Sequence, residues 1–131
     1  LGDVYKRQAL DFIEKVGGKA QLNRDQTEII KMDFSKSKIS DDDLKYLVRY
    51  KLLGNLNLSD TQISDEGLEH LKAADSIGFL FLGGTKVTDE GMIHLKYHKE
   101  LVVLGLNNTR ITDKGLAYLK ELPRLSQLMV L

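Results

Sequence analysis

The 131-residue sequence has no cysteine and a single proline, Pro123. Without cysteine it forms neither a disulfide nor a thiolate site, although this absence identifies no cellular compartment. Nineteen basic and nineteen acidic residues cancel, so no charge of one sign prevails that would attract nucleic acid or an anionic membrane. No uninterrupted apolar run is long enough to span a bilayer. The composition therefore predicts a domain with one core, no nucleic-acid partner and no membrane insertion in this segment.

What the sequence does have is a repeat. The segments that begin at Leu53, Ile77 and Leu101 read LGNLNLSDTQISDEGL, IGFLFLGGTKVTDEGM and LVVLGLNNTRITDKGL, and successive segments lie 24 residues apart. Residues at this spacing form six apolar columns: Ile29, Leu53, Ile77, Leu101, Leu125; Met32, Leu56, Leu80, Leu104, Leu128; Phe34, Leu58, Leu82, Leu106, Val130; Ile39, Ile63, Val87, Ile111; Leu44, Leu68, Met92, Leu116; and Leu47, Leu71, Leu95, Leu119. Such columns, continuous and without insertion, predict a leucine-rich-repeat solenoid with a 24-residue period.

Each repeat is predicted to contain a strand followed by a helix. Leu56 and Leu58 are two residues apart, so in an extended chain both point to the same, inward face. The hydroxyl of Thr61 is expected to satisfy backbone groups in the turn that follows. The run from Ser64 to Gly67 offers a capping side chain and early acids, which suit the start of a helix. Because one repeat cannot bury its own apolar stripe, stability must come from stacking on neighbours.

The repeats resemble a bacterial family of leucine-rich repeats, abundant in planctomycete-like genomes, whose units read L-x-x-L-x-L-x-x-T-x-I-T-D-x-G-L-x-x-L. The resemblance covers residues 29–131. Its signature residues include Thr85, Val87, Thr88, Asp89, Gly91 and, one repeat later, Thr109, Ile111, Thr112, Asp113, Gly115. The first unit departs from the pattern, with Ser37 in place of Thr and Asp43 in place of Gly. The resemblance implies a right-handed α/β solenoid that binds other proteins, with a parallel β-sheet on the concave face and helices on the convex face. It carries over no catalytic residue and no cofactor.

Residues 9–28 do not follow the repeat. Leu10 and Ile13 fit a short amphipathic helix that Gly17 and its neighbouring glycine can end, because glycine accepts the left-handed conformation. Lys19–Leu22 is predicted to be a strand. This segment is expected to be an N-terminal cap that covers the core of the first repeat.

Both ends of the chain carry features of a fragment. Residues 1–8 resemble the in-frame translation of a transposon-end adapter used for sequencing libraries, and we expect a non-native leader; a native disordered leader is the alternative. Residues 29–131 would comprise four full repeats and a truncated fifth strand. Since a solenoid normally shields its last repeat, we expect the natural protein to continue past Leu131.

Two motifs that could signal a ligand site have simpler explanations. The run Gly83-Gly84-Thr85-Lys86 lacks the spacing of a phosphate-binding loop and lies within the repeat pattern. His70 and His94 share a column with Tyr46 and Tyr118, and the sequence shows no cysteine or converging carboxylates beside them, so no metal site is predicted. Nothing suggests a nucleophile with its base, and no enzymatic activity is predicted.

The outward face of the predicted sheet is the candidate binding surface. Phe79 and Phe81 point away from the core by strand alternation, and large aromatic residues among polar ones are typical of an interface. The candidate partner-binding residues are Asn55, Asn57, Phe79, Phe81, Val103, Asn107 and Met129. Two alternatives stay open. The apolar residues are either scattered surface residues of the kind every protein has, or covered by chain that lies beyond this sequence.

The sequence thus favours a monomeric, non-enzymatic scaffold, without cofactor or metal, that binds a protein partner of unknown identity on its concave face. The alternative is a repeat appendage of a larger enzyme or envelope protein, in which these repeats only position another domain.

Overall fold

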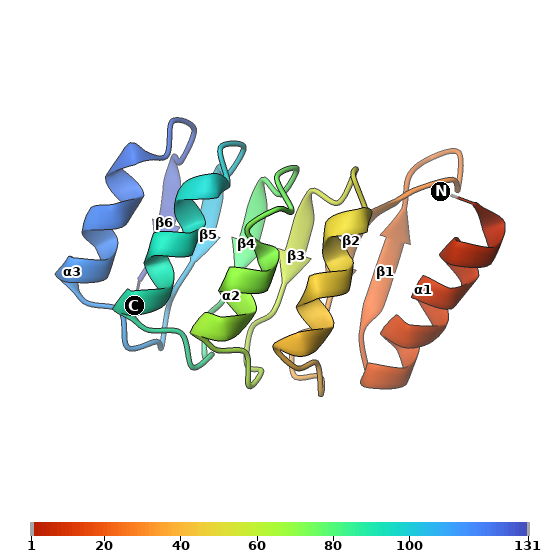
Figure 1. Ribbon diagram of the computed structural model, residues 1–131, viewed down its shortest axis with the longest axis horizontal. Coiled ribbons are helices and arrows are strands. Elements are labelled where there is room, and N and C mark those ends of the chain that lie inside the picture. The colour runs from red at the N-terminus through yellow and green to blue at the C-terminus, as the bar shows by residue number, and fades with distance from the viewer. Residues whose placement is uncertain (1, 131) are drawn as a thin grey trace.

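The computed structural model describes residues 2–130, which form a curved stack of repeats (Figure 1). Its α-helices are α1 (Asp3–Val16), α2 (Asp65–Leu71) and α3 (Asp113–Leu116), and its 3-10 helices are η1 (Asp42–Arg49), η2 (Asp89–Tyr97) and η3 (Ala117–Glu121). Its strands are β1 (Lys19–Leu22), β2 (Ile29–Asp33), β3 (Asn55–Asn57), β4 (Phe79–Phe81), β5 (Val103–Gly105) and β6 (Gln127–Met129). None of the described helices has the length and apolar character needed to cross a bilayer.

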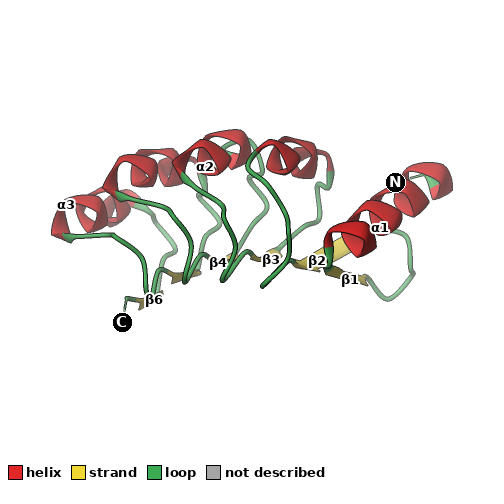
Figure 2. Ribbon diagram, turned by 90° about the horizontal axis from the view of Figure 1, so that it is seen from below, coloured by secondary structure: helices red, strands yellow, loops and turns green. Residues whose placement is uncertain are grey.

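All six strands belong to one sheet, in the order of the chain. β1 pairs with β2 in the antiparallel sense, and every later pair is parallel. The parallel register aligns the apolar columns, since Leu56 pairs with Leu80 and Leu80 with Leu104. Figure 2 shows the strands along the inner side of an arch and the helices of the repeats along its outer side. The predicted α/β class, with a parallel sheet backed by helices, is confirmed.

The core lies between the sheet and the helices and consists of the predicted columns. Leu56, Leu80 and Leu104 are completely buried, as are most other members of the six columns. The exceptions lie toward the C-terminal end of the stack, where Leu128 is 37% and Val130 49% exposed and Ile111, Leu116 and Leu125 are half-buried. No described strand packs beyond β6, so these side chains lack the neighbour that covers their counterparts.

The helices of the repeats are tighter than ordinary α-helices in much of their length. η1 and η2 are 3-10 helices throughout, and α3 continues as η3. In a 3-10 helix side chains three positions apart lie directly above one another. Leu44 and Leu47 have this spacing and are both buried, so the Leu-x-x-Leu pattern suits the geometry.

Aspartates join each repeat helix to the next repeat. Asp41 Oδ1 accepts the Ser64 backbone N–H at 2.8 Å, and its Oδ2 accepts the Ser64 hydroxyl at 2.6 Å. Asp65 binds Thr88 in the same two ways, at 2.8 and 2.5 Å. Asp89 likewise binds Thr112. We call these contacts the aspartate ladder.

The predicted role of Ser64 as a side-chain cap is wrong. Ser64 occupies the N-cap position of α2, but its side chain makes no capping hydrogen bond. The hydroxyl is engaged by Asp41 of the preceding repeat instead. This hydrogen bond to a charged carboxylate is strong and orients the hydroxyl toward the preceding repeat, and the Ser64 oxygen accepts no backbone N–H of α2.

The turn after each strand repeats one conformation. Thr61 donates its hydroxyl hydrogen bond to the carbonyl oxygen of Leu58 at 2.6 Å, as predicted. The residue before this threonine column is left-handed, with φ of 56° at Asp60, 70° at Gly84 and 56° at Asn108. Gly84 therefore belongs to a repeated structural turn, as the repeat pattern indicated.

The segment before the repeats consists of α1 followed by β1, and α1 begins earlier than the predicted helix. α1 starts at Asp3, so the described part of the adapter-like segment forms its first turns. The helix ends at Gly17, which is left-handed at φ 94°, and Ile13 packs into the core. Residues 3–8 lie within α1, in one helix with residues 9–16. Their non-native origin stays a prediction, and Leu1 and Leu131 lie outside the described residues.

Candidate binding face

The sheet face that points away from the helices carries six of the seven predicted binding residues in two rows, and Asn107 lies outside them. Cross-strand pairing aligns Asn55, Phe79 and Val103 in the first row. It aligns Asn57 with Phe81, and Gly105 with Met129, in the second row. Because partners in a parallel sheet lie about 4.8 Å apart, each row is a continuous strip of neighbouring residues across the inner side of the arch.

One half of this face is apolar. Phe79 is 43% exposed, and its row neighbour Val103 is half-buried. In the second row Gly105 separates Phe81 from Met129. A Cβ at position 105 would lie 3.3 Å from Phe81 Cδ1 and 3.2 Å from Met129 Cε, so both side chains lean over the glycine. We call Phe79, Phe81, Val103 and Met129 the aromatic patch.

The other half of the face is polar. Asn57 Oδ1 accepts the backbone N–H of Ser59 at 2.9 Å, and Asp33 Oδ1 accepts that of Ser35 in the same way. Partial burial raises the pKa of Asp33, but the bonds from Ser35 and the charges of nearby lysines outweigh burial and hold this pKa below its ordinary value. Asp33 therefore contributes a fixed negative charge at one end of the face.

Two of the predicted asparagines differ from Asn57 in their surroundings. Asn55 Oδ1 is buried and has no hydrogen-bond partner in the described part of the chain. Asn107 follows β5 and lies against Gly83, where a Cβ would approach its amide within 2.7–2.9 Å. Asn107 therefore borders the face at the turn, while Asn55 lies beside Phe79 with an unused acceptor.

The structure brings together a cluster that the sequence analysis did not find. Asp42, Glu66 and His70 each offer one ligand atom, and these atoms lie within 4.8 Å of one another. The argument that His70 lacks converging carboxylates is therefore wrong. Asp42 comes from the preceding repeat, and its approach depends on how η1 and α2 pack side by side. The repeat spacing gives no signal for this cluster, because Glu66, Glu90 and His94 have the same spacing and do not form one among the described residues.

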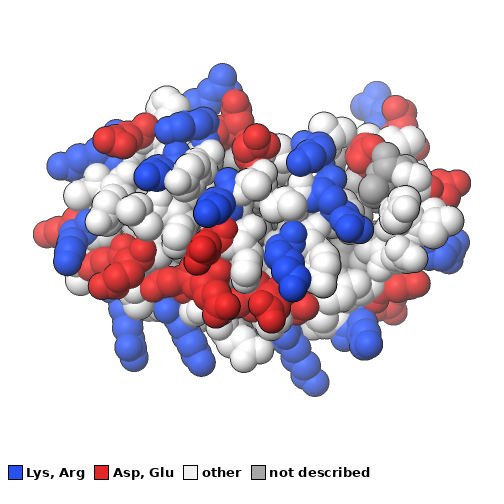
Figure 3. Space-filling model, viewed as in Figure 1, with Lys and Arg blue, Asp and Glu red and all other residues white. Residues whose placement is uncertain are grey.

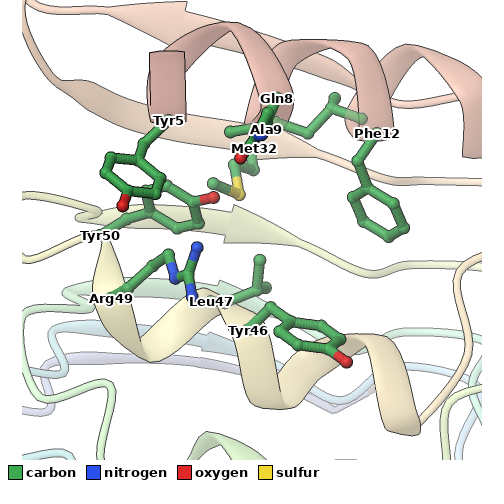
Figure 4. Close-up of a pocket in the computed structure, with 10 residues that line it drawn as sticks. Tyr5, Gln8, Ala9, Phe12, Met32, Tyr46, Leu47, Arg49 and Tyr50 are labelled. Atoms are coloured by element: carbon green, nitrogen blue, oxygen red, sulfur yellow. The ribbon is translucent and has the colours of Figure 1, made fainter. Parts of the chain in front are cut away.

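A cavity of about 200 Å³ separates the N-terminal cap from the first repeat (Figure 4). Tyr5 and Phe12 of α1 line it from one side, and Tyr46, Arg49 and Tyr50 from the other. The cavity lies on the helical side of the molecule, away from the predicted binding face. It is a gap between two packed elements, and it brings none of the predicted site residues together.

The buried histidine His98 was also missed. Its side chain is completely buried, and neither ring nitrogen has a hydrogen-bond partner among the described residues. Burial lowers the pKa of His98, and the nearby backbone of Ala74 and the negative charge of Asp75 oppose this only in part. The column of His98 contains Tyr50, Ala74 and Leu122, all of them buried. That apolar column was the signal that marked this position as part of the core.

Comparison with known proteins supports the fold. A family model described as Leucine Rich repeat matches residues 55–72. No curated protein matches the chain in sequence. Among solved structures, an internalin (inlF) from Listeria monocytogenes is similar with a TM-score of 0.60 and 24% identity. That match covers 72% of this chain and 27% of the internalin chain, so this chain spans about a quarter of that relative.

Two further structures are similar at lower TM-scores. Internalin C2 (inlC2) from Listeria monocytogenes has a TM-score of 0.40 and 13% identity, over 79% of this chain and 74% of that one. A crystal structure of PEPR1-AtPEP1 has a TM-score of 0.48 and 14% identity, over 85% of this chain and 19% of that one. The conclusion rests on the family model, the first internalin and the geometry described above: the chain has the leucine-rich-repeat fold.

Proposed function

We propose that this chain is a non-enzymatic interaction module that binds a partner protein on the inner sheet face. Leucine-rich-repeat proteins typically mediate protein–protein interaction and typically are not enzymes, and the family model and fold support this class. The partner would contact the aromatic patch together with Asn55, Asn57 and Asn107. We also propose a bacterial origin in the planctomycete-like family, on the match to its repeat consensus.

The observation that carries this proposal is the exposure of Phe79 at the centre of the face. An aromatic side chain that is 43% exposed, with apolar neighbours in its own row and the next, has the composition of a binding hot spot. The remaining faces of the repeats carry scattered apolar residues, such as Ile93 and Tyr97 on η2. Single exposed apolar residues are common on protein surfaces, whereas a group of four is a stronger indication.

The size of the face predicts modest affinity. Five parallel strands at ~4.8 Å, each with its outward strand residues and one more outward residue in the turn that follows, at ~3.3 Å rise per residue, give an area on the order of 500 Å². A standard interface buries about 800 Å² on each partner. We therefore expect the partner to bind weakly to these repeats alone, or to use the turns that border the sheet as well.

The test compares three forms of the protein in a cross-linking pull-down from a bacterial lysate. The double variant Phe79→Ala, Phe81→Ala is expected to lose at least tenfold of the captured partner, since hot-spot truncations cost about 2 kcal/mol or more each. The matched control is Ile93→Ala, Tyr97→Ala, which removes exposed apolar side chains from the helical side. Equal capture by the sheet-face variant and the parent would refute the binding face.

A second candidate function is that these repeats are an appendage that positions another domain. Leu128 and Val130 favour it, because they are exposed while their counterparts in every earlier repeat are buried, and they form a surface against which another domain could pack. In that case the sheet-face variant and the control would capture the same proteins.

A further inference from the structure

The cluster of Asp42, Glu66 and His70 lies on the helical side of the molecule, opposite the proposed binding face. Asp42 is the first residue of η1, while Glu66 and His70 both belong to α2. Glu66 and His70 are four residues apart, which places them on the same face of the helix. Acidic side chains gather near the edge where these helices begin (Figure 3). The three ligand atoms approach within 4.8 Å of one another.

His70 offers an unused nitrogen to this cluster. Its Nε2 exposes less than 1 Å² and has no hydrogen-bond partner in the described residues. The nearest carboxylate atom recorded for it, Asp42 Oδ1, lies 3.6 Å away, which is too long for a hydrogen bond, although an ion pair forms at this distance when the ring is protonated. A buried polar atom without a partner is costly, and a metal ion between the nitrogen and the carboxylate would satisfy both.

The next repeat contains the same residue types but not the same cluster. Glu66, Glu90 and His94 occupy the equivalent positions. There the carboxylate of Glu90 accepts the hydroxyl of Thr88 at 2.7 Å, and this bond is the main reason that the pKa of Glu90 lies below its ordinary value. No such bond to Glu66 occurs in the described chain, and only the first trio has its ligand atoms together. The convergence is therefore particular to one site and does not follow from the repeat.

We propose that Asp42, Glu66 and His70 bind a divalent transition-metal ion, with Zn²⁺ as the best fit. Imidazole nitrogen favours zinc and its neighbours over Mg²⁺ and Ca²⁺, and carboxylates are ordinary zinc ligands. Two carboxylates balance the charge of the ion. Three protein ligands leave a coordination position for water. A surface hollow of about 260 Å³, lined in part by Asp42 and Glu66, gives room for that water.

The test is isothermal titration calorimetry of the tag-free full chain with ZnCl₂, with MgCl₂ as a second titrant. One Zn²⁺ per chain is expected, with Mg²⁺ at least tenfold weaker. The variants His70→Ala and Asp42→Asn should each weaken Zn²⁺ binding by at least about tenfold, because removal of even an outer hydrogen-bond partner of a metal ligand weakens metal binding by about that factor. The control His94→Ala removes the equivalent histidine of the next repeat and should leave the affinity unchanged.

Two further measurements keep the result unambiguous. Co²⁺ in place of Zn²⁺ should give visible absorption bands that disappear in His70→Ala, which reports direct nitrogen ligation. The variant His70→Tyr should also lose Zn²⁺ binding. Tyrosine occupies this column at Tyr46 and Tyr118, so misfolding would not explain the lost affinity. Equal Zn²⁺ affinity of the parent and His70→Ala, or equal affinity for Mg²⁺ and Zn²⁺, would overturn the proposal.

Discussion

At the residue scale, the repeat assigns a role to most side chains before their surroundings are known. Thr61, Thr85 and Thr109 each donate a hydroxyl hydrogen bond to the carbonyl three residues earlier, at 2.6 Å in every case. The sequence predicted that the Thr61 hydroxyl would satisfy backbone groups in this turn, and the structure identifies the acceptor as the Leu58 carbonyl. His98 shows where prediction from residue type fails. Histidine is polar, but the other residues of its column, Tyr50, Ala74 and Leu122, are buried, and this column indicates a buried position.

The buried His98 makes stability depend on pH. Its folded-state pKa lies below the unfolded value of about 6.5, so the unfolded chain takes up a proton that the folded chain does not. The stability contributed by the neutral ring is therefore present above pH 6.5 and is lost as the pH falls through that value. We expect the free energy of unfolding to fall between pH 7.5 and 5.5, with a slope of up to about 1.4 kcal/mol per pH unit.

Urea unfolding at several pH values measures this slope. The variant His98→Leu is the comparison, because Leu122 shows that the column accommodates leucine. In His98→Leu the free energy of unfolding should lose most of its dependence on pH above pH 5.5. A variant with the same slope as the parent would assign the effect to other groups.

At the element scale, the strands were predictable and the helix starts were not. Alternation of Leu56 and Leu58 around an outward Asn57 defines β3 from the sequence alone. The contact between Asp41 and Ser64 could not be read locally, since its partners are 23 residues apart. The early acids were assigned to helix starts, and the aspartates among them also act as acceptors for the next repeat.

The aspartate ladder also explains the glycine of the repeat signature. A Cβ on Gly91 would lie 2.1 Å from Asp65 Oδ1, and one on Gly67 would lie 2.5 Å from Asp41 Oδ1. Any larger residue would push the carboxylate from its hydrogen bonds. Asp and Gly in T-D-x-G therefore belong to one contact between neighbouring repeats.

Removal of one carboxylate from the ladder should destabilise the stack. Asp65→Ala leaves the backbone N–H of Thr88 without its acceptor and leaves the Thr88 hydroxyl only the carboxylate of Glu90, at a cost of roughly 1–3 kcal/mol. The matched variant is Asp113→Ala, because no described residue follows at the position that would bind it. Its effect should be limited to the helix-dipole contribution, about 0.3–1 kcal/mol.

Chemical denaturation of the two variants distinguishes them, since both remove an acid from the first turn of a helix. Equal losses of unfolding free energy would show that the ladder contributes nothing beyond the helix start.

At the scale of the whole molecule, the stack is one-dimensional, and each repeat depends on its neighbours. The sequence predicted the layers and the location of the core. It did not predict that β1 would pair antiparallel with β2, nor that α1 would begin at Asp3. The approach of Asp42 to Glu66 and His70 also depends on how adjacent repeats pack, which column patterns do not specify.

The position of a repeat in the stack should set the cost of a core mutation. Leu104→Ala opens a cavity at a completely buried position, and losses of about 2–5 kcal/mol are usual there. Leu128→Ala is the same change in the same column, but its side chain is 37% exposed, so the loss should be under about 1.5 kcal/mol. Thermal unfolding of the two variants checks this order, and the reverse order would contradict a core built by stacking.

The aspartate ladder has a consequence for how such a chain can grow. Each internal repeat carries an acceptor for the repeat that follows it and a donor for the one that precedes it, as Asp65 and Ser64 do. A duplicated 24-residue cassette would therefore arrive with both halves of its connections in place. Gene duplication could lengthen this protein without any compensating substitution, and the same cassette offers a ready unit for building longer synthetic arrays.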